Sequence, residues 1–395
     1  MSQAMSSRIF CKFQNRIICC LLRVVHAKPW KRYLIALTLI ATVYVVLRQW
    51  DNQNSWLNYL LLNGDFGIDF DNFDNVLGAA FPIVPNIIHF IKIGNKSDLT
   101  FEELVCIKAA WLAQKPERIL IHCDYCDYLK SGKYWSQVTR IPNLNLVPVS
   151  VPTHVWGRKL SSLHHASDVL RIRILQRYGG IYLDTDVFLI KHLDFYRRFE
   201  LAIGVPPKQY LGTQVIVGHR SSRFLRLWLE SYRYYKPDRW YYNAGELPTT
   251  SILFKKPTIV HAVPWDFGVH DLRAVLYNAC SPRWRDFRAI HLLSRHRLDG
   301  VKPGDGRPIS FNEENIKSYK KTFGEMARSV MYGQYGIISD DRPPLPPLLV
   351  ALTNFSALPR YCKDKYFLGQ WKFTSAISMF ENEPDAINFF NLWGY

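Results

Sequence analysis

The stretch RYGGIYLDTDVFLI, residues 177–190, places Asp184 and Asp186 in a run of apolar and β-branched residues that is typical of a buried strand. In a strand, residues i and i+2 point to the same face, so these carboxylates would project together, about 7 Å apart along the backbone. Two buried like charges are unfavourable unless a cation lies beside them, and oxygen ligands suit a hard divalent ion. The stretch therefore predicts a metal-binding pair; two solvated acids at a strand end are the alternative.

The preceding residues, SSLHHASDVLRIRILQRYGG, have helical spacing and end at Gly179, a residue type that favours helix ends. Asp168 and Arg171 are three residues apart on this helix and share a face. An exposed ion pair worth ~0.2–0.5 kcal/mol is the ordinary explanation. Because the neighbouring side chains are mostly apolar, we instead expect the pair at a core edge, beside Asp184 and Asp186. Three acids and one arginine are unfavourable there without a ligand, so the group predicts a binding site.

Strand and helix patterns alternate along the chain. The expected strands are 84–94, 117–125, 143–151 and 210–220, and the expected helices are 100–114 and 221–236. The helix that follows Thr100 opens with a capping box. This alternation predicts an α/β domain with a largely parallel sheet, whose ligands collect at the carboxyl ends of the strands.

The basic charge of the chain is concentrated at its N-terminus. The net charge is +17, and the eight basic residues before Asp51 face no acidic residue, which leaves +9 for the remainder. A nucleic-acid partner is not needed to explain this excess, and we expect none. Residues 33–47 carry no charge and are flanked by Trp30 and Trp50, which predicts a short transmembrane segment at 33–50.

Seven basic residues precede that segment, so the positive-inside rule places the N-terminus in the cytosol and the rest of the chain in a lumen. We interpret the segment as a signal anchor. A cleaved signal peptide is the alternative, against which stand the long basic lead and the lack of an A-x-A-like cleavage site. In the lumen, the sequons at Asn95 and Asn354 would be open to glycosylation.

The predicted membrane segment divides the eight cysteines into a cytosolic and a lumenal set. Cys11, Cys19 and Cys20 would be cytosolic, where Cys19 and Cys20 are candidates for palmitoylation or are inert. The lumenal set is odd in number, so at least one thiol stays unpaired; its members are Cys106, Cys123, Cys126, Cys280 and Cys362. For the C-x-x-C pair at Cys123 and Cys126 we favour a structural bridge or free thiols over a zinc or redox site.

The block SDVLRIRILQRYGGIYLDTDV, residues 167–187, resembles the sugar-nucleotide-binding region of DXD-containing glycosyltransferases with a GT-A fold. It looks most like the group that includes animal Golgi α-1,4-galactosyltransferases, α-1,4-N-acetylglucosaminyltransferases and yeast initiating mannosyltransferases, and glucosylating bacterial toxins share the block. The looser pattern extends from Val84 to about His296. The resemblance implies a GT-A-like, mostly parallel sheet flanked by helices.

The same resemblance implies residue roles. Asp186 would bind a divalent cation, Mn²⁺ or Mg²⁺, and Asp184 would contact the ribose and the metal. Asp168 and Arg171 would bind hydroxyls of the donor sugar. The metal would neutralise charge on the departing nucleoside diphosphate. The other donor-binding residues of the block are Gly179 and Gly180, which would let the backbone turn closely beneath the donor, and Tyr182.

Outside the block, such enzymes often use a late histidine as a further metal ligand. We assign this role to His291, with Arg295 placed to meet phosphate; a basic surface loop is the alternative explanation. His261 and His270 are competitors for the same role. Neutral imidazole is a ready metal ligand, so any of the three histidines satisfies the chemistry.

Three further donor or acceptor contacts are weaker predictions. Lys92 stands where the resembling enzymes have an aromatic residue that stacks on the base, which leaves His89 and Phe90 as contacts, with core packing favoured for Phe90. Gln214 falls where the family places an amide near the donor's anomeric carbon. Glu246 is a candidate base or acceptor contact.

Together these features predict a type II Golgi membrane glycosyltransferase that transfers galactose or N-acetylglucosamine from a UDP-sugar to a glycan or glycolipid, with retention and an α-linkage. GDP-mannose is an alternative donor, and a degenerate, non-catalytic binding protein is an alternative function. The expected divisions are a cytosolic tail (1–32), the anchor (33–50), a stem (51–80), the GT-A-like domain (81–340) and a Pro-rich link with an aromatic tail (341–395).

Overall fold

The computed structural model describes residues 68–94, 96, 98–301, 306–338, 361 and 362, all within one unit that begins at Ile68. The expected cytosolic tail, anchor and most of the stem lie outside the described residues. So do both sequons and the Pro-rich link. Within the described part of the chain, no helix has the length and apolar character needed to cross a membrane.

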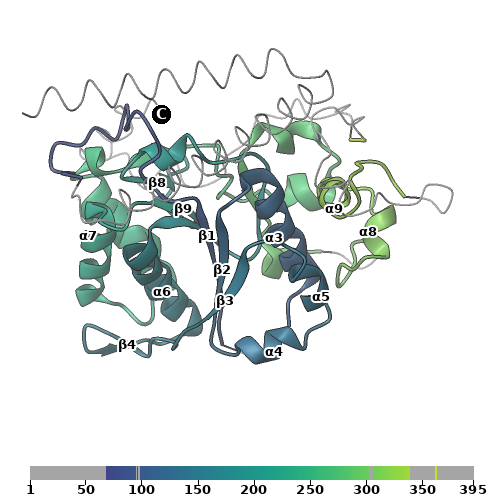
Figure 1. Ribbon diagram of the computed structural model, residues 1–395, viewed down its shortest axis with the longest axis horizontal. Helices are drawn as coiled ribbons and strands as arrows, with labels where there is room; N and C mark the ends of the chain where they lie inside the picture. The colour runs from purple at the N-terminus through teal and green to yellow at the C-terminus, as the bar shows by residue number, and fades with distance from the viewer. Residues whose placement is uncertain (1–67, 95, 97, 302–305, 339–360, 363–395) are drawn as a thin grey trace, which may run out of the picture. The chain divides into compact units, whose positions relative to one another are not determined.

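A seven-stranded sheet forms the centre of the domain (Figure 1). Its order is β10 (His261–Val263), β8 (Leu201–Gly204), β9 (Gly212–Gly218), β6 (Gly180–Leu183), β1 (Ile87–Lys92), β2 (Arg118–Cys123) and β3 (Leu144–Pro148). The four strands from β3 to β6 run parallel, whereas β9 is antiparallel to both of its neighbours. The predicted mixed α/β architecture with a mostly parallel sheet is confirmed.

Helices cover both faces of this sheet (Figure 1). Helix α3 (Phe101–Gln114) lies on one face, and α6 (Leu163–Tyr178) and α7 (Arg223–Ser231) lie on the other. Each face has its own buried core: Phe90 packs with residues of α3, and Tyr182 packs with residues of α6. The expected capping box at the start of α3 is present, and Phe90 has the core position that we favoured.

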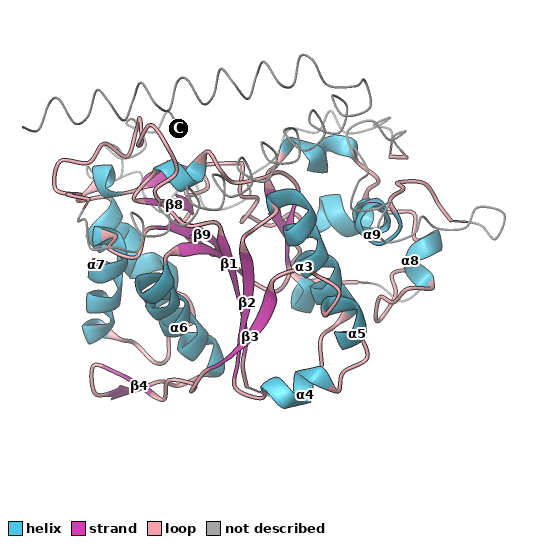
Figure 2. Cartoon of the chain, viewed as in Figure 1, coloured by secondary structure: helices cyan, strands magenta, loops and turns pink. Residues whose placement is uncertain are grey.

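Shorter elements complete the described chain (Figure 2). The remaining α-helices are α4 (Cys126–Lys130), α5 (Trp135–Val138), α8 (Asn315–Ser318) and α9 (Thr322–Tyr332), and the remaining strands are β4 (His154–Val155), β5 (Arg158–Lys159), β7 (Val187–Leu189) and β11 (Ala289–His291). The 3₁₀ helices are η1 (Tyr196–Arg198), η2 (Tyr232–Tyr234), η5 (Pro257–Ile259), η7 (Pro282–Asp286) and η8 (Ser294–His296), and the π-helical segments are η3 (Tyr242–Glu246), η4 (Thr249–Leu253) and η6 (Ala274–Asn278).

Two glycines join α6 to β6. Gly179 ends the helix as expected, with φ at 63°, and Gly180 follows with φ at 109°. A Cβ at Gly180 would lie 2.6 Å from the carbonyl oxygen of Ile87 on β1. Both the left-handed backbone and the close approach of β1 therefore require glycine at this position.

Part of the segment that we assigned to a stem belongs to the described domain. Residues 68–80, which we placed in the stem, pack on the domain: Phe70 is buried, and Asn75 Nδ2 donates to Glu200 Oε2 at 3.1 Å. The polar composition of this segment concealed the packing. Its Asn and Asp side chains bind backbone and buried partners, so they do not mark a solvated linker.

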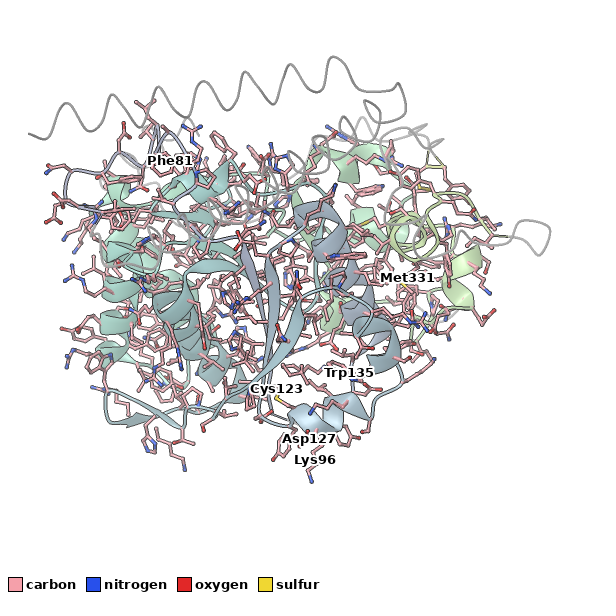
Figure 3. All side chains as sticks on the ribbon, viewed as in Figure 1. Phe81, Lys96, Cys123, Asp127, Trp135 and Met331 are labelled. Carbon is pink, nitrogen blue, oxygen red and sulfur yellow. A yellow bond between two sulfur atoms is a disulfide. The ribbon has the colours of Figure 1, made fainter. Side chains whose placement is uncertain are left out.

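Two disulfides are present among the described cysteines. Cys123–Cys126 bridges the end of β2 and the start of α4, close to the labelled Asp127 in Figure 3, which confirms the structural bridge. Cys280–Cys362 attaches the described part of the tail to the domain. Cys106 is buried and unpaired, in agreement with the odd number of cysteines after Asp51.

Candidate active site

Asp184 and Asp186 lie at the carboxyl edge of the sheet. The prediction of one continuous strand through both residues is wrong: β6 ends at Leu183, and a turn follows in which Val187 N donates to Asp184 O at 3.0 Å. All four residues of β6 are buried, whereas both aspartates are partly exposed. The turn brings the carboxylates out of the sheet to the edge where ligands of parallel strands bind.

A second short strand brings a histidine to these carboxylates. β11 pairs with β7 in antiparallel register, with His291 opposite Val187, and His291 Nε2 lies 3.2 Å from Asp186 Oδ1. Asp184, Asp186 and His291 each offer one ligand atom, and these atoms lie within 4.8 Å of one another. His261 and His270, the competing candidates, belong to no such group among the described residues.

We call Asp184, Asp186 and His291 the metal-ligand group. The charges of Asp186 and His291 shift each other's pKa. Burial alone would raise the pKa of Asp186, but the charge of His291 and hydrogen bonds from His291 and Ser294 hold it well below its usual range. Burial would lower the pKa of His291, and Asp186 raises it. His291 Nδ1 is buried without a hydrogen-bond partner in the described structure. Two carboxylates and one imidazole form a donor set that suits Mn²⁺ and similar divalent ions.

Arg171 connects the helix residues to the aspartates. Its Nη2 lies 3.0 Å from Asp168 Oδ1, its Nη1 lies 3.3 Å from Asp184 Oδ1, and Nη1 donates to Thr213 Oγ1 at 2.8 Å. The side chains of Arg171 and Asp168 are only 7% and 12% exposed, so this pair is not a surface ion pair. Tyr182 donates to Asp184 Oδ1 at 2.7 Å. The predicted helix-to-strand cluster therefore exists, with Arg171 at its centre.

Burial has opposite consequences for the two members of the ion pair. Burial would lower the pKa of Arg171, but Tyr182, Asp184 and Asp168 raise it above its ordinary value. Burial raises the pKa of Asp168, although the charge of Arg171 opposes this effect. The guanidinium thus stays charged, and Asp168 depends on it to remain a carboxylate.

Gln214 lies beside Asp184, as the predicted role near the reacting centre requires. Asp184 N donates to the Gln214 carbonyl oxygen at 2.9 Å across the β6–β9 edge. The side-chain Oε1 of Gln214 is buried and has no hydrogen-bond partner among the described residues. A buried amide oxygen without a partner is costly, so it is available to accept a hydrogen bond from a ligand.

His89, Gly179 and Gly180 are not brought to the site. His89 is fully buried, with Nδ1 3.1 Å from His122 Nε2 and Nε2 2.8 Å from the Gly179 carbonyl oxygen. Burial lowers the pKa of His89 to about 3, and the charge of His122 adds to this effect. Gly179 ends α6 and Gly180 begins β6, whereas Asp184 follows the other end of this strand. Their donor-binding assignment is corrected: these residues pack β6 against β1.

Two other predicted contacts have protein partners. Lys92 Nζ forms an ion pair with Glu103 at 2.7 Å, where we expected the base-stacking position. Glu246 accepts from Arg239 Nη2 at 2.6 Å, and its side chain keeps partial exposure. Glu246 is placed on η3, and no described contact joins it to Asp184.

Arg295 follows Ser294 in the chain, and Ser294 contacts the metal-ligand group. The backbone N of Ser294 donates to Asp186 Oδ2 at 2.9 Å, and Arg295 Nη1 lies 2.9 Å from His164 Nε2 on α6. Arg295 therefore spans from the loop after β11 to the helix that carries Asp168. A cavity of about 520 Å³ is lined in part by this loop. Its lining includes Ser294, Arg295, Arg297, Lys133, Tyr134 and Phe311.

Sequence reasoning missed three residues of the site. His164 lies one helical turn before Asp168, so its spacing could have revealed it. Thr213, the partner of Arg171, precedes Gln214 and could have been considered with it. Ser294 acts through its backbone, which leaves no signal in the sequence.

Comparison with known proteins agrees with this geometry. Residues 102–202 match the family model described as "Glycosyltransferase sugar-binding region containing DXD motif", a range that includes Asp168, Arg171, Asp184 and Asp186. Glucan organizing enzyme 1 of Cryptococcus neoformans var. grubii serotype A is 26% identical over 270 residues, covering 62% of this chain and 70% of that protein. Rat lactosylceramide 4-alpha-galactosyltransferase is 24% identical over 208 residues, covering 47% of this chain and 55% of that enzyme.

Solved glycosyltransferases show weak structural similarity to parts of this chain. The PaToxG glycosyltransferase has a TM-score of 0.32 at 18% identity, covering 53% of this chain and 80% of that chain. GlyE of Streptococcus pneumoniae has a TM-score of 0.37 at 9% identity, covering 71% of this chain and 66% of that chain.

The family match and the carboxylates that it contains define the chain as a glycosyltransferase. Residues 102–202 are similar to the sugar-binding region of DXD-containing glycosyltransferases.

Proposed function

We propose that this glycosyltransferase is metal-dependent and retaining, and that it transfers galactose or N-acetylglucosamine from a UDP-sugar to a glycan or glycolipid. The observation that carries the proposal is the Asp184, Asp186 and His291 group directly beside the buried Asp168–Arg171 pair. The name of the rat relative, a lactosylceramide 4-alpha-galactosyltransferase, supports galactose as the sugar and a glycolipid as the acceptor.

The metal would be held by Asp184, Asp186 and His291, and it would supply Lewis-acid stabilisation to the departing diphosphate. The His291 imidazole and the Ser294 backbone keep the Asp186 carboxylate ionised, so that it can serve as a ligand. Arg171 holds Asp184 from the opposite side. These contacts preorganise the group before a ligand arrives, which reduces the cost of binding.

The donor sugar would bind on the Arg171 side of the group. Asp168 and Arg171 offer a buried carboxylate and a guanidinium to its hydroxyls, and the unpartnered Gln214 Oε1 offers a further acceptor. A sugar hydroxyl paired with a desolvated charge binds more strongly than one paired with an exposed charge. Because Arg171 is tied to Thr213, the sugar-binding groups are fixed relative to β9.

Nucleotide release from UDP-galactose, UDP-N-acetylglucosamine and GDP-mannose, with Mn²⁺ and with a chelator, tests this proposal on the detergent-solubilised full chain. Release that requires Mn²⁺ and fails in Asp186→Asn supports it and identifies the donor. Asp127→Asn, at an aspartate that is fully exposed on α4, is the matched control and should retain activity. Undiminished release with the metal chelated contradicts the metal mechanism, and metal-dependent donor binding without turnover when acceptors are supplied favours the degenerate binding protein.

We also propose that residues 33–50 anchor the chain in the Golgi membrane with the catalytic domain in the lumen. The uncharged segment, its basic lead and the two disulfides support this orientation, because disulfides persist in oxidising compartments. Carbonate extraction of membranes, with glycosidase treatment of wild type and an Asn354→Gln variant, tests it. Release of the protein by carbonate would contradict the anchor.

A further inference from the structure

Trp240 presents an exposed aromatic face at the rim of the site. Its residue is 61% exposed, in the loop between η2 and η3. Its ring packs edge-to-face on the His164 ring, with the ring centroids 4.6 Å apart. Single exposed apolar side chains are common and need no explanation. Trp240 is of interest because it packs on His164, a residue of the site.

His164 connects Trp240 to the site. It precedes Asp168 by four residues on α6, so the two side chains share a face of the helix. Burial lowers the pKa of His164. The charges of Arg295 and Arg171 also lower it, whereas the charge of Asp184 raises it. His164 thus contacts the Trp240 indole and shares a helix face with Asp168, one of the groups assigned to the donor sugar.

The loop that carries Trp240 is held in place. The Trp240 carbonyl oxygen lies 3.1 Å from His165 Nε2, Arg239 pairs with Glu246, and Trp228 Nε1 donates to the Asn243 carbonyl oxygen at 3.1 Å. The backbone is thus anchored at several points while the indole stays in solvent. A fixed, exposed aromatic face beside a binding site loses little conformational entropy when a ligand covers it.

The position of Trp240 favours an acceptor over the donor nucleoside. His164, which the indole contacts, lies one helical turn from Asp168 on the same face of α6, and Asp168 borders the sugar side of the site. The donor diphosphate has to lie at the metal-ligand group. The Trp240 residue is 61% exposed, whereas the Asp168 side chain is 12% exposed, so the indole lies outward of the groups assigned to the donor sugar, where an acceptor has to arrive from solvent.

We propose that Trp240 is the platform on which the acceptor's terminal sugar stacks, with the apolar C–H face of a pyranose ring against the indole. This inference rests on the proposed function. Aromatic faces carry negative charge and attract the weakly positive C–H groups of a ring laid over them.

Saturation-transfer difference NMR tests the platform on the full chain in detergent, with lactose, N-acetyllactosamine and methyl α-mannoside as probes. We expect transfer to the ring C–H protons of at least one probe, with the Kd raised about 10-fold in Trp240→Ala and less in Trp240→Phe. Trp156→Ala is the matched control, since Trp156 is 44% exposed and its Nε1 donates to Leu229 O, away from the site residues. It should bind like wild type.

Equal binding by wild type and Trp240→Ala would overturn the platform, and so would the absence of binding of every probe to wild type. In the transfer reaction, the change in Trp240→Ala should fall on the KM for the acceptor. A rise confined to the KM for the donor would instead assign the indole to the nucleoside and overturn the proposal. Sugar binding that depends on Trp240 in a chain that releases no nucleotide would support the platform while the proposed transferase function fails.

Discussion

His291 Nε2 lies 3.2 Å from Asp186 Oδ1, although the two residues come from distant parts of the chain. The antiparallel pairing of β11 with β7 sets this distance, because it places His291 opposite Val187, the residue that follows Asp186. The backbone of Ser294 then closes on the other carboxylate oxygen. The metal-ligand group is therefore built by a short two-stranded ladder that adjoins the end of the main sheet.

Replacement of His291 tests this ladder directly. His291→Ala should weaken Mn²⁺ binding by about 100-fold, because even loss of an outer-shell partner of a metal ligand costs about 10–100-fold in affinity. Calorimetric titration with Mn²⁺ measures the change without requiring the substrate. His296→Ala is the control, since His296 is exposed on the same segment and paired with Asp299. Equal Mn²⁺ affinity in the two variants would remove His291 from the ligand set.

Arg171 should matter for both stability and donor use. Arg171→Met leaves Asp168 and Asp184 without their cation, and removing one partner of a buried pair costs about 3–5 kcal/mol of unfolding free energy. Arg171→Lys keeps the charge but cannot reach both carboxylates and Thr213, so it should lower kcat/KM for the donor with a smaller loss of stability. Urea unfolding and donor kinetics measure the two effects.

Arg173→Met, at an exposed position of the same helix, provides the comparison for Arg171. It should leave both quantities close to those of wild type. A stability loss of similar size in Arg173→Met and Arg171→Met would mean that the helix, rather than the buried pair, is sensitive to substitution.

The two disulfides should differ in their effect on stability. Cys280 and Cys362 are separated by 82 residues, so Cys362→Ser should lower the unfolding free energy by about 2–5 kcal/mol. Cys126→Ser opens a bridge of sequence separation 3, which constrains the unfolded chain less, and should cost about 2 kcal/mol or less. Urea unfolding of the variants measures both losses. A larger loss in Cys126→Ser would contradict this loop-length argument.

Stability should decline in mild acid because of buried histidines. Burial lowers the pKa of His89 to about 3 and that of His122 to about 4. In the unfolded chain both would titrate near pH 6.5, so below about pH 6.5 the unfolded state binds protons that the folded state excludes. Each group should therefore remove up to about 1.4 kcal/mol per pH unit as the pH falls from 6.5 toward its folded pKa.

His89→Gln isolates one of these contributions, since its amide nitrogen can still reach the Gly179 carbonyl oxygen that His89 Nε2 contacts. Unfolding free energies measured between pH 7 and 5 should fall less steeply for this variant than for wild type. Parallel curves would show that His89 does not contribute to the acid sensitivity.

Local signals in the sequence predicted much of the fold. The capping box placed the start of α3, and Gly179 placed the end of α6, because caps and left-handed turns depend on residues within one helical turn. The alternation of strand and helix patterns predicted the α/β domain and its largely parallel sheet, but not the antiparallel β9. The spacing of Asp168 and Arg171 placed both on one helix face, and the block that contains them identified the class of enzyme.

Long-range packing decided the rest. The apolar, β-branched run around Asp184 and Asp186 suggested a strand, but β6 ends at Leu183 and the pairing of β7 with β11 puts both carboxylates beside His291. His89 looked like a ligand contact, and the fold buried it. Trp240 carried no signal until α6 brought His164 against it. Backbone caps and periodicity report interactions between near neighbours, whereas a binding site forms where distant segments meet, and that meeting depends on how the whole core packs.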